Sequence, residues 1–262
     1  MKKNNIPRVL SIAGSDSGGC AGIQADLRVL NFLGCHGSTA ITAITAQNTL
    51  GVKEIFPLPT HIIQQQIDVV MEDIGADAIK IGMLFNQETI ETIAAICKKY
   101  SGIPIVLDPV CVATTGAQLL HPTALNALVK ELIPMATVIT PNQFEVDLLL
   151  SQCVINPKIN NLADQLNCKA CLITGGDAQS QMVCDELHFK GSNSPIIFEH
   201  AKIATQNTHG SGCSLSTAIS AFLAMGFGVE KAIHQAIQFI EIGIKGGVNK
   251  IIGNGPGPLC FK

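Results

Sequence analysis

The segment THGSGCSLSTAISAFLAMG, residues 208–226, places two glycines before a helix-like stretch with no charge in its first turns. Glycines let the backbone come close to a ligand, and the free N–H groups at the start of a helix point in one direction. With the partial positive charge of the helix end, they could hold a transferring phosphoryl group without Lys or Arg. The spacing therefore predicts an anion hole at Gly210, Ser211, Gly212 and Cys213, and a glycine turn that only packs tightly is the alternative.

Cys213 falls at this electropositive helix start, where the pKa of a thiol can be lowered. A nucleophile, a proton acceptor and an inert helix residue are all compatible with the position. Phosphoryl transfer depends more on positioning and charge neutralisation than on covalent chemistry. We therefore interpret Cys213 as a residue that contacts the substrate, and covalent catalysis is the least favoured role.

A second glycine-rich segment, SIAGSDSGGCAGIQADL, covers residues 11–27 between a predicted strand and a predicted helix. It contains neither GxGxxG in the proper register nor GxxxxGK[ST], so it does not match the common nucleotide-binding loops. The segment fits a substrate loop, which Gly14 opens and which Gly19 and Gly22 keep open. Asp26 could accept hydrogen bonds from a hydroxyl or amino group, and a solvated helix residue is the alternative.

Two further segments, LDPV at 107–110 and ITPNQFEVDLL at 139–149, each end a predicted strand with polar groups and a proline. Asn142 and Glu145 have the spacing of a capping box, which is the favoured interpretation from spacing alone. Asp108 and Glu145 are candidate Mg²⁺ ligands, because Mg²⁺ often takes only one or two carboxylates together with substrate phosphates.

The elements that position these residues follow from hydrophobic periodicity. Short apolar runs alternate with helix-like segments, which predicts a parallel, doubly wound sheet. The predicted strands are 8–14, 39–47, 77–82, 104–110, 136–140 and 170–174, and the predicted helices are 22–33, 60–73, 87–99, 122–132 and 142–151. Beyond these, an antiparallel edge pair is expected near 181–188 and 195–200, followed by helices 211–225 and 229–245. Ligands of such sheets bind beyond the carboxyl ends of the strands, where the polar and glycine residues gather.

Composition excludes several functional classes. The 262 residues are 47% hydrophobic and 14% charged, with no Trp and one Tyr, so a large aliphatic core is expected but no aromatic platform for nucleic acid. A net charge of −3 offers no basic field for nucleic acid or an anionic membrane. With no repeat, linker or low-complexity tract, we expect one domain over residues 1–262.

The N-terminal run VLSIAG is too short for a membrane span or a signal peptide, so a cytoplasmic location is expected. The ten cysteines are scattered through aliphatic segments. The pair Cys168 and Cys171 lacks a second pair at zinc-site spacing. We therefore assign no metal to cysteine and expect most cysteines to be small core residues.

Taken in order, the motifs AGSD, GGCAGIQADL, ITAITAQNTLGV, IKIGML, VLDPV, ITPNQFE, ITGGD and NTHGSGCSLSTAI resemble the hydroxymethylpyrimidine and phosphomethylpyrimidine kinases of the ribokinase-like superfamily. The resemblance spans residue 9 to about residue 225. It implies a three-layer α/β/α sandwich with a mostly parallel sheet and an antiparallel edge. The implied activity is ATP- and Mg²⁺-dependent phosphorylation of 4-amino-5-hydroxymethyl-2-methylpyrimidine and its monophosphate in thiamine biosynthesis, by a homodimer.

The resemblance also implies roles for single residues. The pyrimidine would lie among Gly14, Ala21, Asp26, Thr45, Gln47, Met83 and Val110, with Gln47 pairing its polar edge. The turn from Gly210 to Cys213 would hold the moving phosphate. The Mg-ATP phosphates would lie near Asn142 and Glu145, and the nucleotide would be bordered by Thr174, Gly175, Gly176 and Thr205.

The chain departs from the family pattern mainly by lacking basic residues. The usual DPSGGAG is DSGGCAG here, and Thr114, Thr174 and Ile237 stand where family members often have Lys. Loss of cations should weaken phosphate binding, which predicts reduced turnover of the monophosphate or a shifted substrate.

Two other functions compete with this interpretation. Pyridoxal or pyridoxamine kinase activity uses the same fold on another hydroxymethyl-bearing heterocycle. A non-catalytic vitamin-binding protein is the alternative from another class, although a pure binder has little use for an anion hole. An NAD-dependent enzyme is disfavoured because no predicted strand is followed by the required glycine fingerprint.

Overall fold

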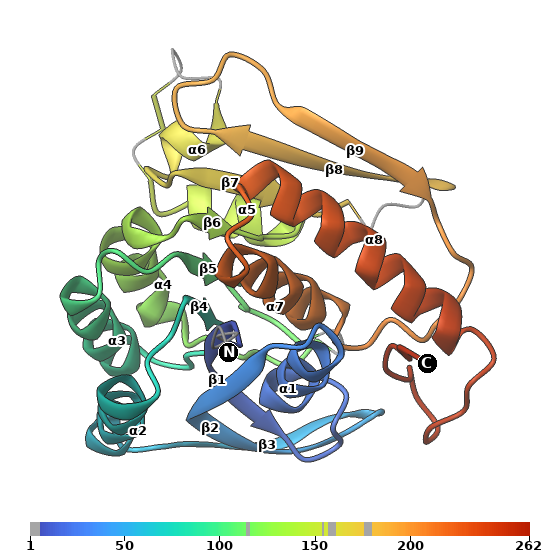
Figure 1. Cartoon of the computed structure of the whole chain (residues 1–262), viewed down its shortest axis with the longest axis horizontal. Helices are drawn as coiled ribbons and strands as arrows, with labels where there is room; N and C mark the ends of the chain where they lie inside the picture. The colour runs from blue at the N-terminus through green and yellow to red at the C-terminus, as the bar shows by residue number, and fades with distance from the viewer. Residues whose placement is uncertain (1–5, 114–115, 154, 157–160, 176–179) are drawn as a thin grey trace, which may run out of the picture.

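The computed structural model describes residues 6–113, 116–153, 155–156, 161–175 and 180–262, and one nine-stranded sheet runs through this part of the chain (Figure 1). The order across the sheet is β3-β2-β1-β4-β5-β6-β7-β8-β9, in which β2, β1, β4, β5, β6 and β7 are parallel. The strands are β1 (Arg8–Asp16), β2 (His36–Asn48), β3 (Gly51–Pro57), β4 (Ala78–Ile81), β5 (Ile105–Leu107), β6 (Val138–Ile139), β7 (Ala170–Ile173), β8 (Met182–Phe189) and β9 (Ile196–Ala201). The expected fold class, including the antiparallel edge of β8 and β9, is confirmed.

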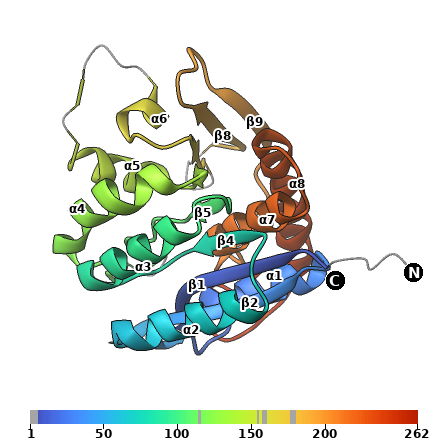
Figure 2. The same cartoon turned by 60° about the vertical axis from the view of Figure 1, so that its left-hand side comes forward.

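Helices cover both faces of the sheet (Figures 1 and 2). One face carries α1 (Gly22–Phe32), α7 (Ser211–Ala224) and α8 (Val229–Gly247). The other carries α2 (Thr60–Asp73), α3 (Gln87–Lys99), α4 (Leu125–Ala127), α5 (Gln143–Leu150) and α6 (Leu162–Gln165). None of the helices in the described part of the chain combines the length and hydropathy that a membrane crossing requires.

The core has two layers because side chains alternate along each buried strand. Val9 and Ala78 pack with the α1, α7 and α8 layer, whereas the next residues, Leu10 and Ile79, pack with the layer on the opposite face. All four residues of β4 are buried. Alternation therefore directs Lys80, two residues after Ala78, toward α1 and α7.

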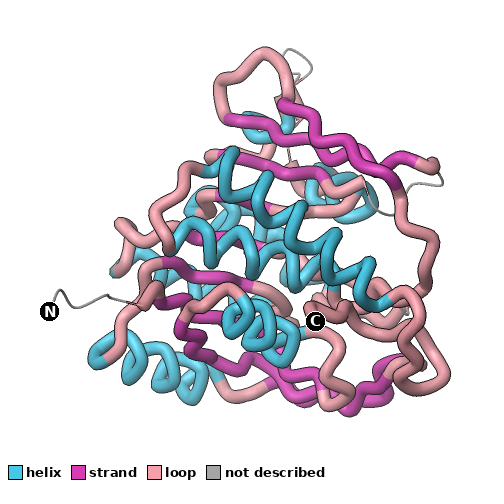
Figure 3. Tube along the Cα trace, turned by 45° about the vertical axis from the view of Figure 1, so that its right-hand side comes forward, coloured by secondary structure: helices cyan, strands magenta, loops and turns pink. Residues whose placement is uncertain are grey.

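Helix α7 lies between α1 and α8 (Figures 1 and 3). Its residues Ser216, Thr217, Ala218, Ser220 and Ala221 are all 0% exposed. Small side chains at these positions let neighbouring elements approach α7 closely. The start of the helix is thereby held at the carboxyl ends of the central strands.

Local structure differs from the sequence-based expectation in two places. Strand β3 was not expected, and it pairs antiparallel to β2 after a tight turn in which Asn48 Oδ1 accepts the N–H of Leu50. The segment expected to form one helix over 122–132 is instead a 3₁₀ turn (Pro122–Ala124), the single turn α4, and a π-type turn (Leu128–Leu132). Proline at the start and again at 134 restricts the backbone of this segment.

Candidate active site

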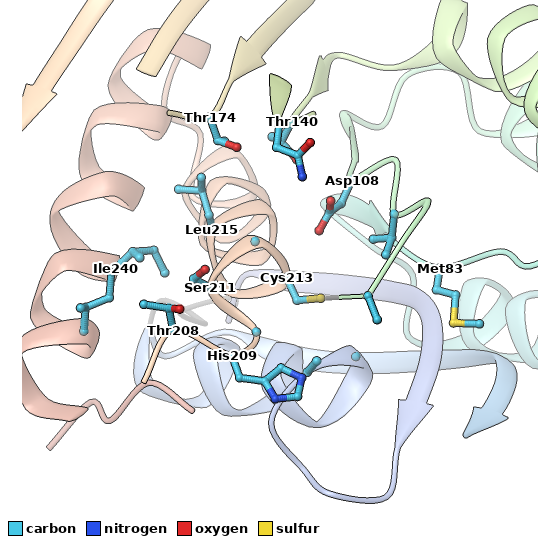
Figure 4. Close-up of a pocket in the computed structure, with 18 of the residues that line it drawn as sticks. Met83, Asp108, Thr140, Thr174, Thr208, His209, Ser211, Cys213, Leu215 and Ile240 are labelled. Atoms are coloured by element: carbon cyan, nitrogen blue, oxygen red, sulfur yellow. The ribbon is translucent and has the colours of Figure 1, made fainter. Parts of the chain in front are cut away.

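A cavity of about 550 Å³ opens where the parallel strands end, as the fold class predicts. Its walls come from the segments that follow β1, β4, β5, β6 and β7, and from the start of α7. Figure 4 shows Asp108 and Cys213 near the middle, Met83 on one side, and Leu215 and Ile240 on the other. We call the part of the cavity around Gln47 and Met83 the first compartment and the part around Leu215 and Ile240 the second, and Cys213, in the first turn of α7, lies between Met83 and Ile240 (Figure 4).

Most of the predicted site residues line this one cavity. They are Gly14, Ala21, Thr45, Gln47, Met83, Asp108, Val110, Asn142, Glu145, Thr174, Thr205, Gly210, Ser211, Gly212 and Cys213. Gly176 and Thr114 lie outside the described residues. Ile237 packs against the hydrophobic layer of α7 and α8, so its side chain lies at the edge of the hydrophobic core.

Asp26 does not fit either interpretation made from the sequence. It is 0% exposed, beneath the cavity wall, so it is neither a solvated helix residue nor a side chain presented to a ligand. Its carboxylate accepts hydrogen bonds from Ser11, Lys80 and Thr217. The expectation failed because α1 turns this position inward, toward β4 and α7.

The two glycine segments pack against each other at the cavity floor. Gly210 has φ +80°, and a Cβ at this position would overlap the carbonyl oxygen of Cys20. Gly22 has φ +56°, and a Cβ there would overlap the carbonyl oxygen of Gly14. Close packing and an exposed N–H turn therefore coexist, because glycine at 210 permits both the left-handed backbone and the contact.

Asp16 organises the N-terminal loop, a role that the sequence interpretation missed. Its carboxylate accepts the N–H groups of Gly18, Cys20 and Ala21, each at 2.8 Å. A strand-ending Asp followed by glycines is typical of a side chain that bonds backbone N–H groups a few residues ahead. The loop shape at the substrate side is set by this carboxylate.

The capping box at the start of α5 is confirmed. Asn142 Oδ1 accepts the N–H of Glu145 at 2.9 Å, and Glu145 Oε2 accepts the N–H of Asn142 at 3.0 Å. Glu145 Oε1 also accepts the N–H of Cys111 at 3.3 Å, which ties the loop after β5 to this helix. The carboxylate still borders the cavity, so the cap and a role at the site are compatible.

Gln47 is oriented by its neighbours. Thr45 Oγ1 lies 3.0 Å from the carbonyl oxygen of Ser15 and 3.1 Å from Gln47 Oε1, so its one hydrogen is shared between two acceptors, and Gln47 Nε2 lies 3.4 Å from His209 Nε2. His209 lines the same wall and was not predicted. These contacts place the Gln47 amide in the wall of the cavity that also contains Met83.

The pKa of Cys213 is raised, whereas the start of a helix was expected to lower it. The residue is partly exposed to the cavity, but the cavity is deep, so burial raises the thiol pKa to about 12. The positive charge of Lys80 and the N–H of Gly22 act in the other direction and are outweighed. At neutral pH Cys213 is a neutral thiol, which disfavours a nucleophilic thiolate.

Asp108 is 6% exposed, and burial raises its pKa to about 6 even though Lys80 and the Ser216 hydroxyl favour the ionised form. Ser216 Oγ lies 3.2 Å from Asp108 Oδ2. A Cβ on Gly212 would lie 3.9 Å from the same oxygen. A carboxylate thus faces the predicted anion hole directly.

The second compartment is apolar on one side and polar on the other. Leu215, Ile240 and Ile244 line it, and so do Thr174 and Asp185. Gly175 is not among the described lining residues. Its N–H instead donates to Asp185 Oδ1 at 2.7 Å, so it acts behind the wall.

Two lining residues of this compartment were missed by the sequence analysis. Asp185 is 4% exposed, and its Oδ2 lies 3.7 Å from His200 Nε2 on the neighbouring strand. Burial raises the pKa of Asp185. The sequence of these two edge strands does not show which of their charged side chains face the cavity.

Comparison with known proteins agrees with this geometry. The phosphomethylpyrimidine kinase family model matches residues 16–259. A hydroxymethylpyrimidine/phosphomethylpyrimidine kinase of Mycobacterium bovis is 40% identical over 258 residues, which cover 97% of this chain and 93% of that protein.

Solved structures with the same fold include two related kinases. The ADP complex of Bacillus subtilis pyridoxal kinase is 34% identical, with a TM-score of 0.86 and 98% of each chain covered. A phosphomethylpyrimidine kinase from Clostridium difficile 630 is 38% identical, with a TM-score of 0.76 over 91% of this chain and 99% of that one. Because the family model spans nearly the whole sequence and the Mycobacterium bovis relative matches over 93% of its own length, the chain belongs to the phosphomethylpyrimidine kinase family.

Proposed function

We propose that this protein transfers the terminal phosphate of ATP to the hydroxymethyl group of 4-amino-5-hydroxymethyl-2-methylpyrimidine, and then phosphorylates the monophosphate, in thiamine biosynthesis. The observation that carries the proposal is the turn from Gly210 to Cys213, which opens at the meeting point of the two compartments. A phosphate held there is within reach of both a nucleotide on one side and an alcohol on the other.

The compartment around Gln47 suits the pyrimidine. Its amide offers one donor group and one acceptor side by side, with Thr45 next to the oxygen and His209 next to the nitrogen. An aminopyrimidine edge presents the complementary pair, so recognition by Gln47 leaves no buried polar group unpaired. Gly14, Ala21, Met83 and Val110 supply close backbone approach and apolar contact for the ring.

The compartment around Leu215, Ile240 and Ile244 suits the nucleotide. These side chains form an apolar wall of the kind that holds a purine ring. Thr174, Thr205 and Asn142 offer polar atoms between this wall and the start of α7. The terminal phosphate then reaches the N–H groups at the helix start, where backbone donors stabilise charge in the transition state.

Asp108 and Glu145 fit Mg²⁺ by donor chemistry, since hard oxygen ligands from one or two carboxylates suffice beside phosphates. Both line the cavity, and an ionised Asp108 next to an anion hole would repel phosphate unless a cation lay between them. Mg²⁺, when bound, would supply neutralisation of the phosphate charge. Cys213 contacts the reacting groups as a neutral thiol.

Pyridoxal kinase activity is the second candidate, because a pyridoxal kinase structure superposes on this chain with a TM-score of 0.86. A substrate panel separates the two activities. Purified protein with Mg-ATP is offered the hydroxymethylpyrimidine, its monophosphate and pyridoxal, and ADP formation and phosphorylated products are both measured. We expect the pyrimidine to give the highest kcat/KM, and a clear preference for pyridoxal would overturn the substrate assignment.

The same panel tests the weakened second step. Thr174 lines the nucleotide compartment in place of the family's usual Lys, and the monophosphate brings a further phosphate into a cavity with less positive charge, so we expect a lower kcat/KM for the monophosphate than for the alcohol. Thr174→Lys should raise turnover of the monophosphate if missing charge is the reason. Equal efficiency of the wild type on both pyrimidines would refute this hypothesis.

A non-catalytic vitamin-binding protein would show pyrimidine binding by calorimetry without any ATP turnover. A single kinase domain over residues 1–262, a homodimer and a cytoplasmic location remain predictions. Sedimentation of the purified protein tests the dimer directly.

A further inference from the structure

Lys80 is an exceptional residue in the sheet. It stands in β4 between Ile79 and Ile81, and its side chain is 0% exposed. Lysine is almost never fully buried unless it is paired, because removing an ammonium group from water is costly. A charge kept at the centre of an apolar parallel strand therefore requires a specific partner.

The partner is Asp26 of α1. Lys80 Nζ lies 3.1 Å from Asp26 Oδ1 and 3.0 Å from Oδ2. Ser11 Oγ of β1 donates to Oδ2 at 2.5 Å, and Thr217 Oγ1 of α7 donates to Oδ1 at 2.7 Å. One carboxylate thus joins four elements, and both of its oxygens receive two donors.

The electrostatics keep Lys80 charged. Burial acts to lower its pKa, but the negative charges around it, led by Asp26, outweigh burial and raise the pKa above its ordinary value. Lys80 is also one of the residues that line the cavity floor, so this charge lies directly below the site. Asp26 also accepts the hydroxyls of Ser11 and Thr217, so its carboxylate is hydrogen-bonded on both oxygens.

Helix α7 is attached to this carboxylate close to its start. Thr217 contacts Asp26, and the residue before it, Ser216, contacts Asp108 at 3.2 Å. These consecutive hydroxyls lie about one turn beyond Gly212 and Cys213. Rotation or translation of α7 would break both bonds and redirect the N–H groups at the helix start.

We propose that Lys80 is a positioning residue for phosphoryl transfer: it holds Asp26, and Asp26 holds the register of α7 through Thr217. The inference rests on the proposed kinase function. It adds a residue that acts through Asp26 and Thr217 and takes no part in the recognition of the pyrimidine by Gln47. Misplacement of the anion hole affects the transition state more than the bound substrates, since catalysis is sensitive to displacements of about 1 Å. The expected signature is a fall in kcat with little change in KM for either substrate.

The test begins with Thr217→Val, which keeps the side-chain shape and the Lys80–Asp26 pair but removes the hydroxyl. We expect kcat to fall about tenfold, with both KM values within about twofold of the wild type. Thr217→Ser should restore most of the loss. The matched control is Ser220→Ala, because Ser220 is also a buried hydroxyl of α7 but donates to the carbonyl of Ser216 within the helix. This control should keep wild-type kcat.

Lys80→Met tests the origin of the effect through a double-mutant cycle. If Lys80 acts through Asp26 and Thr217, the variant with both Lys80→Met and Thr217→Val should be no slower than Lys80→Met alone, because the two changes remove one connection. Multiplying losses would show that Lys80 does not work through Thr217. If Lys80→Met does not fold, the cycle is run with Lys80→Arg, which keeps the charge but changes the contact with Asp26, and multiplying losses would again overturn the role of Lys80.

Amide NMR shifts make the outcome independent of substrate identity. In ¹⁵N-labelled protein without ligand, Thr217→Val should move the Gly212 and Cys213 amide signals, and Ser220→Ala should move them less. Unchanged signals together with unchanged kcat would overturn the inference, even for an active pyrimidine kinase. Shifted signals in a protein that phosphorylates none of the panel would instead refute the proposed function and leave the positioning intact.

Discussion

Replacing Asp108 by Asn should stabilise the protein while reducing its activity. Asp108 is 6% exposed, and the hydroxyl of Ser216 lies 3.2 Å from its Oδ2. An Asn side chain keeps the shape and an oxygen that can accept this hydroxyl, but it carries no charge. The substitution therefore isolates the free-energy cost of holding a buried carboxylate beside the anion hole.

The magnitude follows from the pKa of Asp108. Its ordinary value is 3.8, and burial raises it to about 6 in the folded protein. Between these values the folded state binds more protons than the unfolded state, so stability falls as pH rises through this window. Above the window the ionised form costs about 3 kcal/mol, at about 1.4 kcal/mol for each pH unit between the two pKa values.

The variant lacks this titration, so its advantage should grow with pH. From about pH 4.5 to about pH 7.5, the free energy of unfolding of Asp108→Asn minus that of the wild type should increase by about 2 kcal/mol. Taking the difference cancels the titration of the groups that do not interact with Asp108. The attraction between Lys80 and ionised Asp108 is already contained in the pKa of about 6, so it is not subtracted again from this cost.

Urea unfolding followed by circular dichroism measures both proteins, in EDTA and without nucleotide so that no ligand contributes. Steady-state turnover with Mg-ATP should fall at least about tenfold in the same variant. A stability difference that is constant with pH would refute the argument, since it would show that Asp108 is not held ionised against burial. Full activity of the variant would refute its role at the site.

Three other changes probe the cavity walls. Gly210→Ala should lower the free energy of unfolding by about 1 to 3 kcal/mol, because Gly210 has φ +80° and the added methyl group would overlap a backbone carbonyl. The control Gly228→Ala should lower it little, because Gly228 has φ −68° and open space around it. Equal urea midpoints for the two would contradict this packing. Because the pKa of Cys213 is raised to about 12, iodoacetamide should alkylate it more slowly at neutral pH than it alkylates the exposed Cys184. Peptide mass spectrometry measures both rates, and faster labelling of Cys213 would disprove the neutral thiol. Gln47→Ala should raise the KM for the pyrimidine about tenfold at nearly constant kcat, and an unchanged KM in steady-state kinetics would move the ring elsewhere in the cavity.

Secondary structure was largely predictable because its signals are local. The apolar runs of β1, β4 and β5 are buried parallel strands as expected, and the Asn142–Glu145 spacing forms the expected capping box. The glycine turn before α7 also lies where its sequence indicated. Strand β3 was missed, although a tight turn followed by GVKEIFP, with its β-branched and aromatic residues, carried a usable signal.

The sequence by itself determined the parallel sheet, the edge at which ligands bind and the turn that opens onto it, because each depends on residues close together in the chain. Only the tertiary structure decided what the charges do. Asp26 meets Thr217 across 191 residues and Lys80 across 54, so no local pattern could show that it ties helices together rather than contacting a ligand. Burial likewise reversed the expected pKa of Cys213, since the free energy of a charge depends on its surroundings in space and not on its neighbours in sequence.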